Sequence, residues 1–173
     1  DKGYEAYSEG NYELAVEEWS ASALAGDPFA KYSLGMMYEH GRGVEQSFSS
    51  AIRLYSQSAE EGVPQARHNL AWIYLRGDTD GNLVSEGARL LEENAKMGYG
   101  PSQSDVAMMY KNGDFVDQDT SKAIEYLESA AEQGVSSAQN TLGMMYCHGD
   151  CVLQDLEKAK GLYEGAAEQG DPI

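Results

Sequence analysis

The stretch Leu34-Gly35-Met36-Met37-Tyr38 decides the fold of this chain, because it returns along the sequence at a fixed interval. It comes back as Leu142-Gly143-Met144-Met145-Tyr146, with the related stretches Leu70-Ala71-Trp72-Ile73-Tyr74 and Val106-Ala107-Met108-Met109-Tyr110 between them. The tyrosines that end the four stretches are each 36 residues apart. A strict repeat of this length indicates a solenoid, in which each unit is one supersecondary motif stacked on its neighbours. We therefore expect function on an extended surface rather than in a catalytic pocket.

Residues 26–61 show how one unit is expected to fold. Gly26 ends the preceding helix, because glycine adopts the left-handed conformation at a helix end without steric cost. Asp27-Pro28 begins the next helix with a capping carboxylate and a proline at the first helical position. Gly41 ends that helix, and Ser47 is placed to cap a second one. Each unit is thus predicted to be a pair of helices.

The second unit departs from this plan. Asp119 and Asp155 occupy the cap position of Ser47 in later units, but Leu83 stands there in the second. Gly87 also falls where the other units have alanine. We expect a distorted loop and a weaker helix start in this unit.

The charge of the chain limits its partners. The 173 residues carry 29 acidic and 12 basic side chains, a formal net charge of -17. A phosphate backbone would be repelled, which argues against nucleic acid, whereas a basic protein or peptide would be attracted. No stretch approaches the ~20 apolar residues of a membrane span. The chain opens at Asp1 with neither a methionine nor a signal peptide, which suggests a processed or excised piece.

Metal and thiol chemistry are weakly indicated. Cys147 and Cys151 are too few for a disulfide framework, so they are either two free thiols at a loop or one local disulfide. With His148 they would supply three zinc ligands where a structural site needs four. The oxygen-rich segment 78–82 resembles a calcium loop, but an EF-hand needs other residues at its sixth and twelfth positions. We predict no metal and no cofactor.

The repeat resembles a known family. The pattern is alanine, Leu-Gly-x-x-Tyr, Gly-x-Gly-Val, Asp-x-x-Lys-Ala and Ala-Ala-x-x-Gly. The fourth unit matches it best, at Ala138, Leu142, Gly143, Tyr146, Gly149, Val152, Asp155, Lys158, Ala159, Ala166, Ala167 and Gly170. This pattern is similar to that of the Sel1-like repeats (SLR), relatives of the tetratricopeptide repeat. The resemblance implies an all-α, right-handed α/α solenoid that works as an adaptor or scaffold, and not as an enzyme.

The resemblance also divides the chain. Residues 1–173 are expected to form a single repeat domain, which opens with a tetratricopeptide-like hairpin at 1–26. Four Sel1-like units follow at 27–62, 63–98, 99–134 and 135–170, and residues 171–173 begin a further unit.

In proteins of this type the first helix of each unit lines the concave face, and its exposed positions can be carried over to this sequence. They are Tyr32, Met36, Glu39 and His40; His68, Trp72, Leu75 and Arg76; Ser104, Met108, Lys111 and Asn112; and Asn140, Met144, Cys147 and His148. Trp72 and Arg76 lie one helical turn apart and are residue types that often dominate interface energies. The alternative is that Trp72 packs against the adjoining unit and that the methionines fill the core.

The favoured function is therefore capture of a peptide or partner protein in this groove. The acidic ends of the second helices, such as Glu60-Glu61, are either a solvated face or a docking surface for a basic partner. A rival function is a cell-envelope enzyme or binding protein acting on peptide or peptidoglycan fragments. A third is a spacer that oligomerises through its open ends. A periplasmic or secreted location is slightly favoured over a cytoplasmic one.

Overall fold

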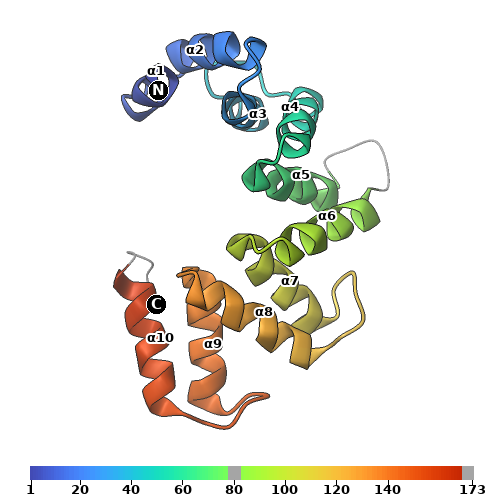
Figure 1. Cartoon of the computed structure of the whole chain (residues 1–173), viewed down its shortest axis with the longest axis vertical. Helices are drawn as coiled ribbons and strands as arrows, with labels where there is room; N and C mark the ends of the chain where they lie inside the picture. The colour runs from blue at the N-terminus through green and yellow to red at the C-terminus, as the bar shows by residue number, and fades with distance from the viewer. Residues whose placement is uncertain (78–82, 169–173) are drawn as a thin grey trace. The chain divides into compact units, whose positions relative to one another are not determined.

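The computed structural model describes residues 1–77 and 83–168, and these residues form ten helices and no strand (Figure 1). The helices are α1 (Lys2–Ser8), α2 (Tyr12–Leu24), α3 (Pro28–His40), α4 (Phe48–Glu60), α5 (Pro64–Arg76), α6 (Val84–Lys96), α7 (Gly100–Asn112), α8 (Thr120–Glu132), α9 (Ser136–His148) and α10 (Leu156–Glu168). Consecutive helices such as α3 and α4, or α7 and α8, pack as pairs. The predicted all-α solenoid is confirmed.

By its contacts the chain divides into two compact parts, each larger than one repeat. We call them unit 1, residues 1–90, and unit 2, residues 91–173. The division falls inside α6, so this helix begins in unit 1 and ends in unit 2. The single repeat domain expected from the sequence stays a prediction.

The helix ends are those that the sequence predicts. The Asp27 carboxylate accepts hydrogen bonds from the backbone of Phe29 and Ala30 at 2.9 and 3.3 Å, and Gly41 ends α3 with φ 63°. The Ser47 hydroxyl caps α4 by accepting from the Ser50 amide at 3.2 Å. In unit 2, Asp119 and Asp155 cap the second helices in the same way, accepting from Lys122 at 3.1 Å and from Lys158 at 2.9 Å.

The second repeat, residues 63–98, departs from the common plan at Gly87, and this departure has a steric explanation. A Cβ built on Gly87 would lie 2.7 Å from the carbonyl oxygen of Ala71 and 2.9 Å from the Leu75 side chain. Because α5 and α6 approach this closely, alanine does not fit at this position. The loop that we expected to be distorted and the candidate calcium ligands at 78–82 lie outside the described residues.

Each unit has its own apolar core. In unit 1, Trp19, Leu34, Met37 and Leu54 form one buried cluster, and a second one surrounds Tyr55. In unit 2 the cluster joins α7, α8 and α9 through Ala107, Leu127, Ala130, Ala138, Leu142 and Met145. The repeated tyrosines Tyr38, Tyr74 and Tyr146 are half-buried against these clusters.

Two repeated tyrosines in unit 2 also bind acidic residues of the preceding second helix. The Tyr110 hydroxyl donates to Glu92 Oε1 at 2.5 Å. The Tyr146 hydroxyl donates to Glu128 Oε1 at 3.3 Å and accepts from Lys158 Nζ at 2.6 Å. The hydrogen bond to Glu92, with a contribution from burial, raises the pKa of the Tyr110 hydroxyl to about 12.

The raised pKa of Tyr110 predicts a loss of stability in alkali. An unfolded tyrosine ionises near its ordinary value of about 10, whereas the folded one stays protonated to about 12. The contribution of Tyr110 to the free energy of unfolding is therefore complete below pH 10 and is lost as the pH rises from 10 through 12. We expect the urea midpoint of unfolding to fall across this range, and to fall less in Tyr110→Phe. Replacement of the exposed Tyr4 by phenylalanine is the control, and an equal fall in Tyr110→Phe and the wild type would contradict the assignment.

The loops between paired helices contain two strained residues. Phe115 and Cys151 have φ of 64° and 63°, at the repeat position where Gly43 has φ 70°. Residues other than glycine adopt this left-handed backbone conformation at a cost of roughly 1–3 kcal/mol.

Relief of this strain should stabilise the protein. We expect Phe115→Gly to raise the free energy of unfolding by about 1 kcal/mol, because glycine adopts the positive φ without a Cβ clash. Urea unfolding followed by circular dichroism measures the change. Phe115→Ala removes the same exposed ring but keeps the strain, so a gain of equal size in that variant would show that strain is not the cause.

Candidate partner-binding surface and pocket

In unit 1 the predicted groove residues other than Glu39 lie on α3 and α5, and we call this set the unit-1 strip. Its members are Tyr32, Met36 and His40 on α3 and His68, Trp72, Leu75 and Arg76 on α5. Tyr32 and Met36 are half-buried against the cluster around Tyr55, while His40 and Arg76 are exposed. His68, Trp72 and Leu75 are half-buried. The strip therefore combines packed aromatic and thioether side chains, Tyr32 and Met36, with the exposed nitrogen-bearing side chains of His40 and Arg76.

Glu39 is not an exposed groove residue, as the sequence led us to expect. Only 6 % of it is exposed, and its carboxylate accepts hydrogen bonds from the Tyr55 hydroxyl at 2.7 Å and from Arg76 Nη2 at 2.6 Å. A buried carboxylate is stable only when it is paired and hydrogen-bonded, and both conditions are met here. Glu39 therefore connects α3 to α4 and to α5.

Tyr55 is the centre of this network. Burial, and then the nearby Glu39 carboxylate, raise the pKa of Tyr55 far above its ordinary value, so its hydroxyl stays protonated and donates to Glu39. The same hydroxyl accepts a hydrogen bond from Asn69 Nδ2 at 3.2 Å. Burial also raises the pKa of Tyr32, whose ring lies 6.0 Å from that of Tyr55. Buried contacts therefore hold Arg76 in place and border the ring of Tyr32.

In unit 2 the predicted groove residues are placed less uniformly. Met144 is 47 % exposed, and Met108 and Lys111 are half-buried. The Asn112 amide donates to Asp114 at 3.1 Å, and His148 Nδ1 lies 2.9 Å from the Met144 carbonyl oxygen. The Asn140 Oδ1 atom is buried without a hydrogen-bond partner.

Ser104 is the second groove residue that is not exposed. It is buried, and its hydroxyl lies 2.9 Å from that of Ser137 on α9. Repeat spacing placed Ser104 on the surface, but its small side chain allows α9 to cover it. The role of the groove residues in binding stays a prediction.

The cysteines are free thiols in the structure, and the local disulfide stays a prediction. The Cys151 thiol lies 3.4 Å from Asp150 Oδ1, and this hydrogen bond raises the pKa of the exposed Cys151. Within residues 1–77 and 83–168, no group of three histidine, cysteine or acidic side chains is arranged to hold a metal ion.

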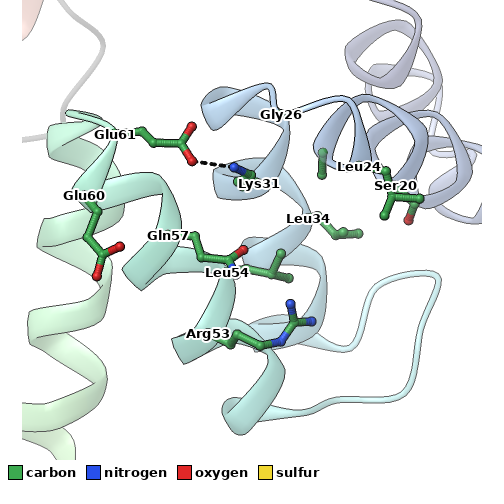
Figure 2. Close-up of a pocket in the computed structure, with 11 residues that line it drawn as sticks. Ser20, Leu24, Gly26, Lys31, Leu34, Arg53, Leu54, Gln57, Glu60 and Glu61 are labelled. Atoms are coloured by element: carbon green, nitrogen blue, oxygen red, sulfur yellow. Dashed lines mark hydrogen bonds and ion pairs between the residues drawn. The ribbon is translucent and has the colours of Figure 1, made fainter.

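A pocket of about 610 Å³ opens between α2, α3 and α4, and of its lining residues sequence reasoning had considered only Glu60 and Glu61 as binding residues (Figure 2). Leu34 and Leu54 form its buried floor, and Lys31 and Arg53 contribute the basic side chains. Lys31 Nζ lies 2.5 Å from Glu61 Oε1. The one sequence signal is Leu24, an apolar residue at the end of α2 where the later second helices have Glu60, Lys96, Glu132 and Glu168.

The described part of the chain contains no helix that is long and apolar enough to cross a membrane.

Comparison with protein families identifies the repeat. The sequence model of the Sel1 repeat matches at residues 28–63, 64–99, 100–135 and 136–171. These units have the period predicted from the sequence and begin one residue later than the predicted boundaries. A search of curated proteins found no match.

Solved structures share the fold. A Sel1 repeat protein from Oxalobacter formigenes superimposes with a TM-score of 0.85 at 26 % identity, over 98 % of this chain and 69 % of its own length. The protective antigen c5321 of uropathogenic Escherichia coli, which has an SLR fold, gives 0.78 at 28 % identity and covers 90 % of this chain. This chain spans only 33 % of that antigen. The immunity protein Pa5087 of Pseudomonas aeruginosa gives 0.71 at 22 % identity, over 97 % of this chain and 66 % of its own length.

The Glu39 network predicts a specific cost of mutation. Glu39→Ala leaves the buried Tyr55 hydroxyl without its acceptor and removes the partner of Arg76, so we expect the free energy of unfolding to fall by about 2 kcal/mol. Urea unfolding measures the loss. Glu60→Ala, which removes an exposed carboxylate of unit 1, should change stability by no more than about 0.5 kcal/mol. Equal effects of the two substitutions would show that the network does not stabilise the fold.

Proposed function

The chain belongs to the Sel1 repeat family, and from this premise we propose that it is a non-enzymatic interaction module that binds a peptide or partner protein on the unit-1 strip. Proteins with this solenoid commonly act by binding other proteins. The partner would lie across α3 and α5, over Tyr32, Met36 and Trp72.

The main support for the proposal is that Arg76 is both exposed and held in position. Its side chain is 48 % exposed, yet its guanidinium is held at 2.6 Å by the buried carboxylate of Glu39. A charged group that is already fixed in position loses little conformational entropy when a partner binds. Arg76 also lies one helical turn from Trp72, so an apolar contact and a charged contact are available side by side.

The net charge supports a basic partner. With 29 acidic and 12 basic side chains, the protein attracts a basic surface from a distance and repels an acidic one. We infer that such long-range attraction increases the rate of encounter, while the strip supplies the specific contacts. Association through the solenoid ends stays a prediction, which sedimentation at increasing protein concentration would test.

The first experiment is a crosslinked pull-down from the source organism. We expect the double variant Trp72→Ala, Arg76→Ala to lose a partner that the wild type captures, with an affinity lower by a factor of about 30 or more. Circular dichroism must first show that the variant is folded, because loss of Arg76 also affects Glu39. Arg76→Lys, which keeps a charge beside Glu39 but lacks the planar guanidinium, separates binding from stability.

A matched control removes the same residue types elsewhere in unit 1. Phe29 is an exposed aromatic residue at the start of α3, and Arg89 is an exposed arginine of α6. The double variant Phe29→Ala, Arg89→Ala should retain the partner. Equal retention by both double variants would move the site away from the strip. Capture of no partner at all would direct attention to peptide and peptidoglycan fragments, the ligands of the rival function.

A further inference from the structure

The pocket between α2, α3 and α4 is lined by residues at which this part of the chain departs from the later repeats. In the other three units the residue at the position of Lys31 donates to a carbonyl of the preceding second helix: Arg67 to Ala59 at 3.3 Å, Gln103 to Ala95 at 3.2 Å and Gln139 to Ala131 at 3.3 Å. Lys31 instead pairs with Glu61 at 2.5 Å. The Lys31 side chain therefore does not bridge to Ala23. The equivalent seam of the third repeat also holds a pocket, of about 470 Å³, in which Lys96 and Glu125 take the places of Leu24 and Arg53, so the first pocket is distinguished by its lining.

Arg53 is the second departure. Among the described residues it makes no hydrogen bond or ion pair, although it is one of only 12 basic residues in a chain with 29 acidic ones. Arg89 occupies the same position in the next unit, and its guanidinium is held by Glu86 at 2.5 and 2.8 Å. In the first repeat, Ser50 stands at the position of Glu86, and its hydroxyl lies 3.0 Å from that of Ser47. The Arg53 guanidinium is thus left available at the pocket.

Leu24 is the third departure. It is 91 % exposed at the mouth of the pocket, in a position that is charged in every later second helix. With the buried Leu34 and Leu54 it gives the pocket an apolar surface. Figure 2 shows Arg53 at one end of this surface and the Lys31–Glu61 pair at the other.

We infer that this pocket binds an apolar molecule that carries one carboxylate. The apolar part would lie on Leu24, Leu34 and Leu54, and the carboxylate would pair with Arg53, whose planar guanidinium matches a carboxylate in bidentate geometry. The volume of about 610 Å³ is within the range of small-molecule sites. A single negative charge is favoured over a phosphate dianion, because Glu60 and Glu61 also line the pocket. This site does not depend on the unit-1 strip being a binding surface.

Octanoate is the probe that tests the inference. Titration into isotope-labelled protein, followed by NMR, should shift the methyl signals of Leu24, Leu34 and Leu54 and the Nε–Hε signal of Arg53, with a dissociation constant of about 1 mM. Octan-1-ol has the same chain length without the charge and should bind at least about tenfold more weakly. Octanoate and octan-1-ol binding equally would overturn the role assigned to Arg53.

Two variants locate the site. Arg53→Gln should weaken octanoate binding about tenfold or more, whereas Arg89→Gln, the same change at the equivalent position of the next unit, should leave it unchanged. Leu24→Glu introduces the residue that α4, α8 and α10 have at this position and should also weaken binding. Unchanged backbone signals away from the pocket show that each variant is folded. Loss of binding in Arg89→Gln as well, or in neither arginine variant, would overturn the proposal.

A second probe identifies the source of the carboxylate. Acetyl-alanyl-leucine carries an apolar side chain beside a free terminal carboxylate, as the end of a peptide does. Tighter binding of octanoate, dependent on Arg53, would assign the pocket to free acids, and tighter binding of the dipeptide would assign it to peptide ends. Binding of neither probe would overturn the proposal. Trp72→Ala should leave both affinities unchanged, which separates this site from the function proposed for the strip.

Discussion

The close approach of paired helices is the constraint on which the rest of the structure depends. A Cβ built on Gly35 would lie 2.7 Å from the ring of Tyr55, and one built on Gly143 would lie 3.1 Å from the ring of Tyr163. Alanine takes this place in the other two units, as Ala71 and Ala107, and both are fully buried. Small residues at a crossing let two helix backbones approach, and neighbouring side chains then fill the space around the contact. The glycine or alanine that recurs at this position therefore sets the distance between the helices of each pair.

This packing determines the chemistry of the unit-1 surface. Because Gly35 lets the Tyr55 ring lie close to α3, the Tyr55 hydroxyl reaches Glu39, and Glu39 in turn holds Arg76 on α5. A crossing of small residues in the interior thus decides where a guanidinium is found at the surface. The stability of the helix pair and the order of the proposed binding strip are two results of the same contact.

Sequence reasoning predicted what all units share. Helix starts at Asp27 and Ser47, the helix end at Gly41 and the all-α solenoid follow from spacing, because caps and periodicity are local properties. It was wrong about the exposure of Glu39, because the position of a residue in the repeat does not show which side chains of other helices will bind it. It also missed the pocket lined by Arg53 and Leu24. A comparison of each unit with its own repeats would have found Leu24 and Ser50, but not the contacts of Lys31.

The lining of the seam beside Lys31 has a consequence for how such a protein acquires specificity. The later repeats form the equivalent seam with helices of the same length, and at Gln103 this seam holds a pocket lined by Lys96 and Glu125 where the first has Leu24 and Arg53. The chain thus contains several copies of one architecture, in which the lining of one seam differs from that of another while the helices that form both are kept. Gene duplication gives separate proteins this freedom, and internal repetition gives it to neighbouring segments of one polypeptide. New recognition can arise in one seam without a second gene.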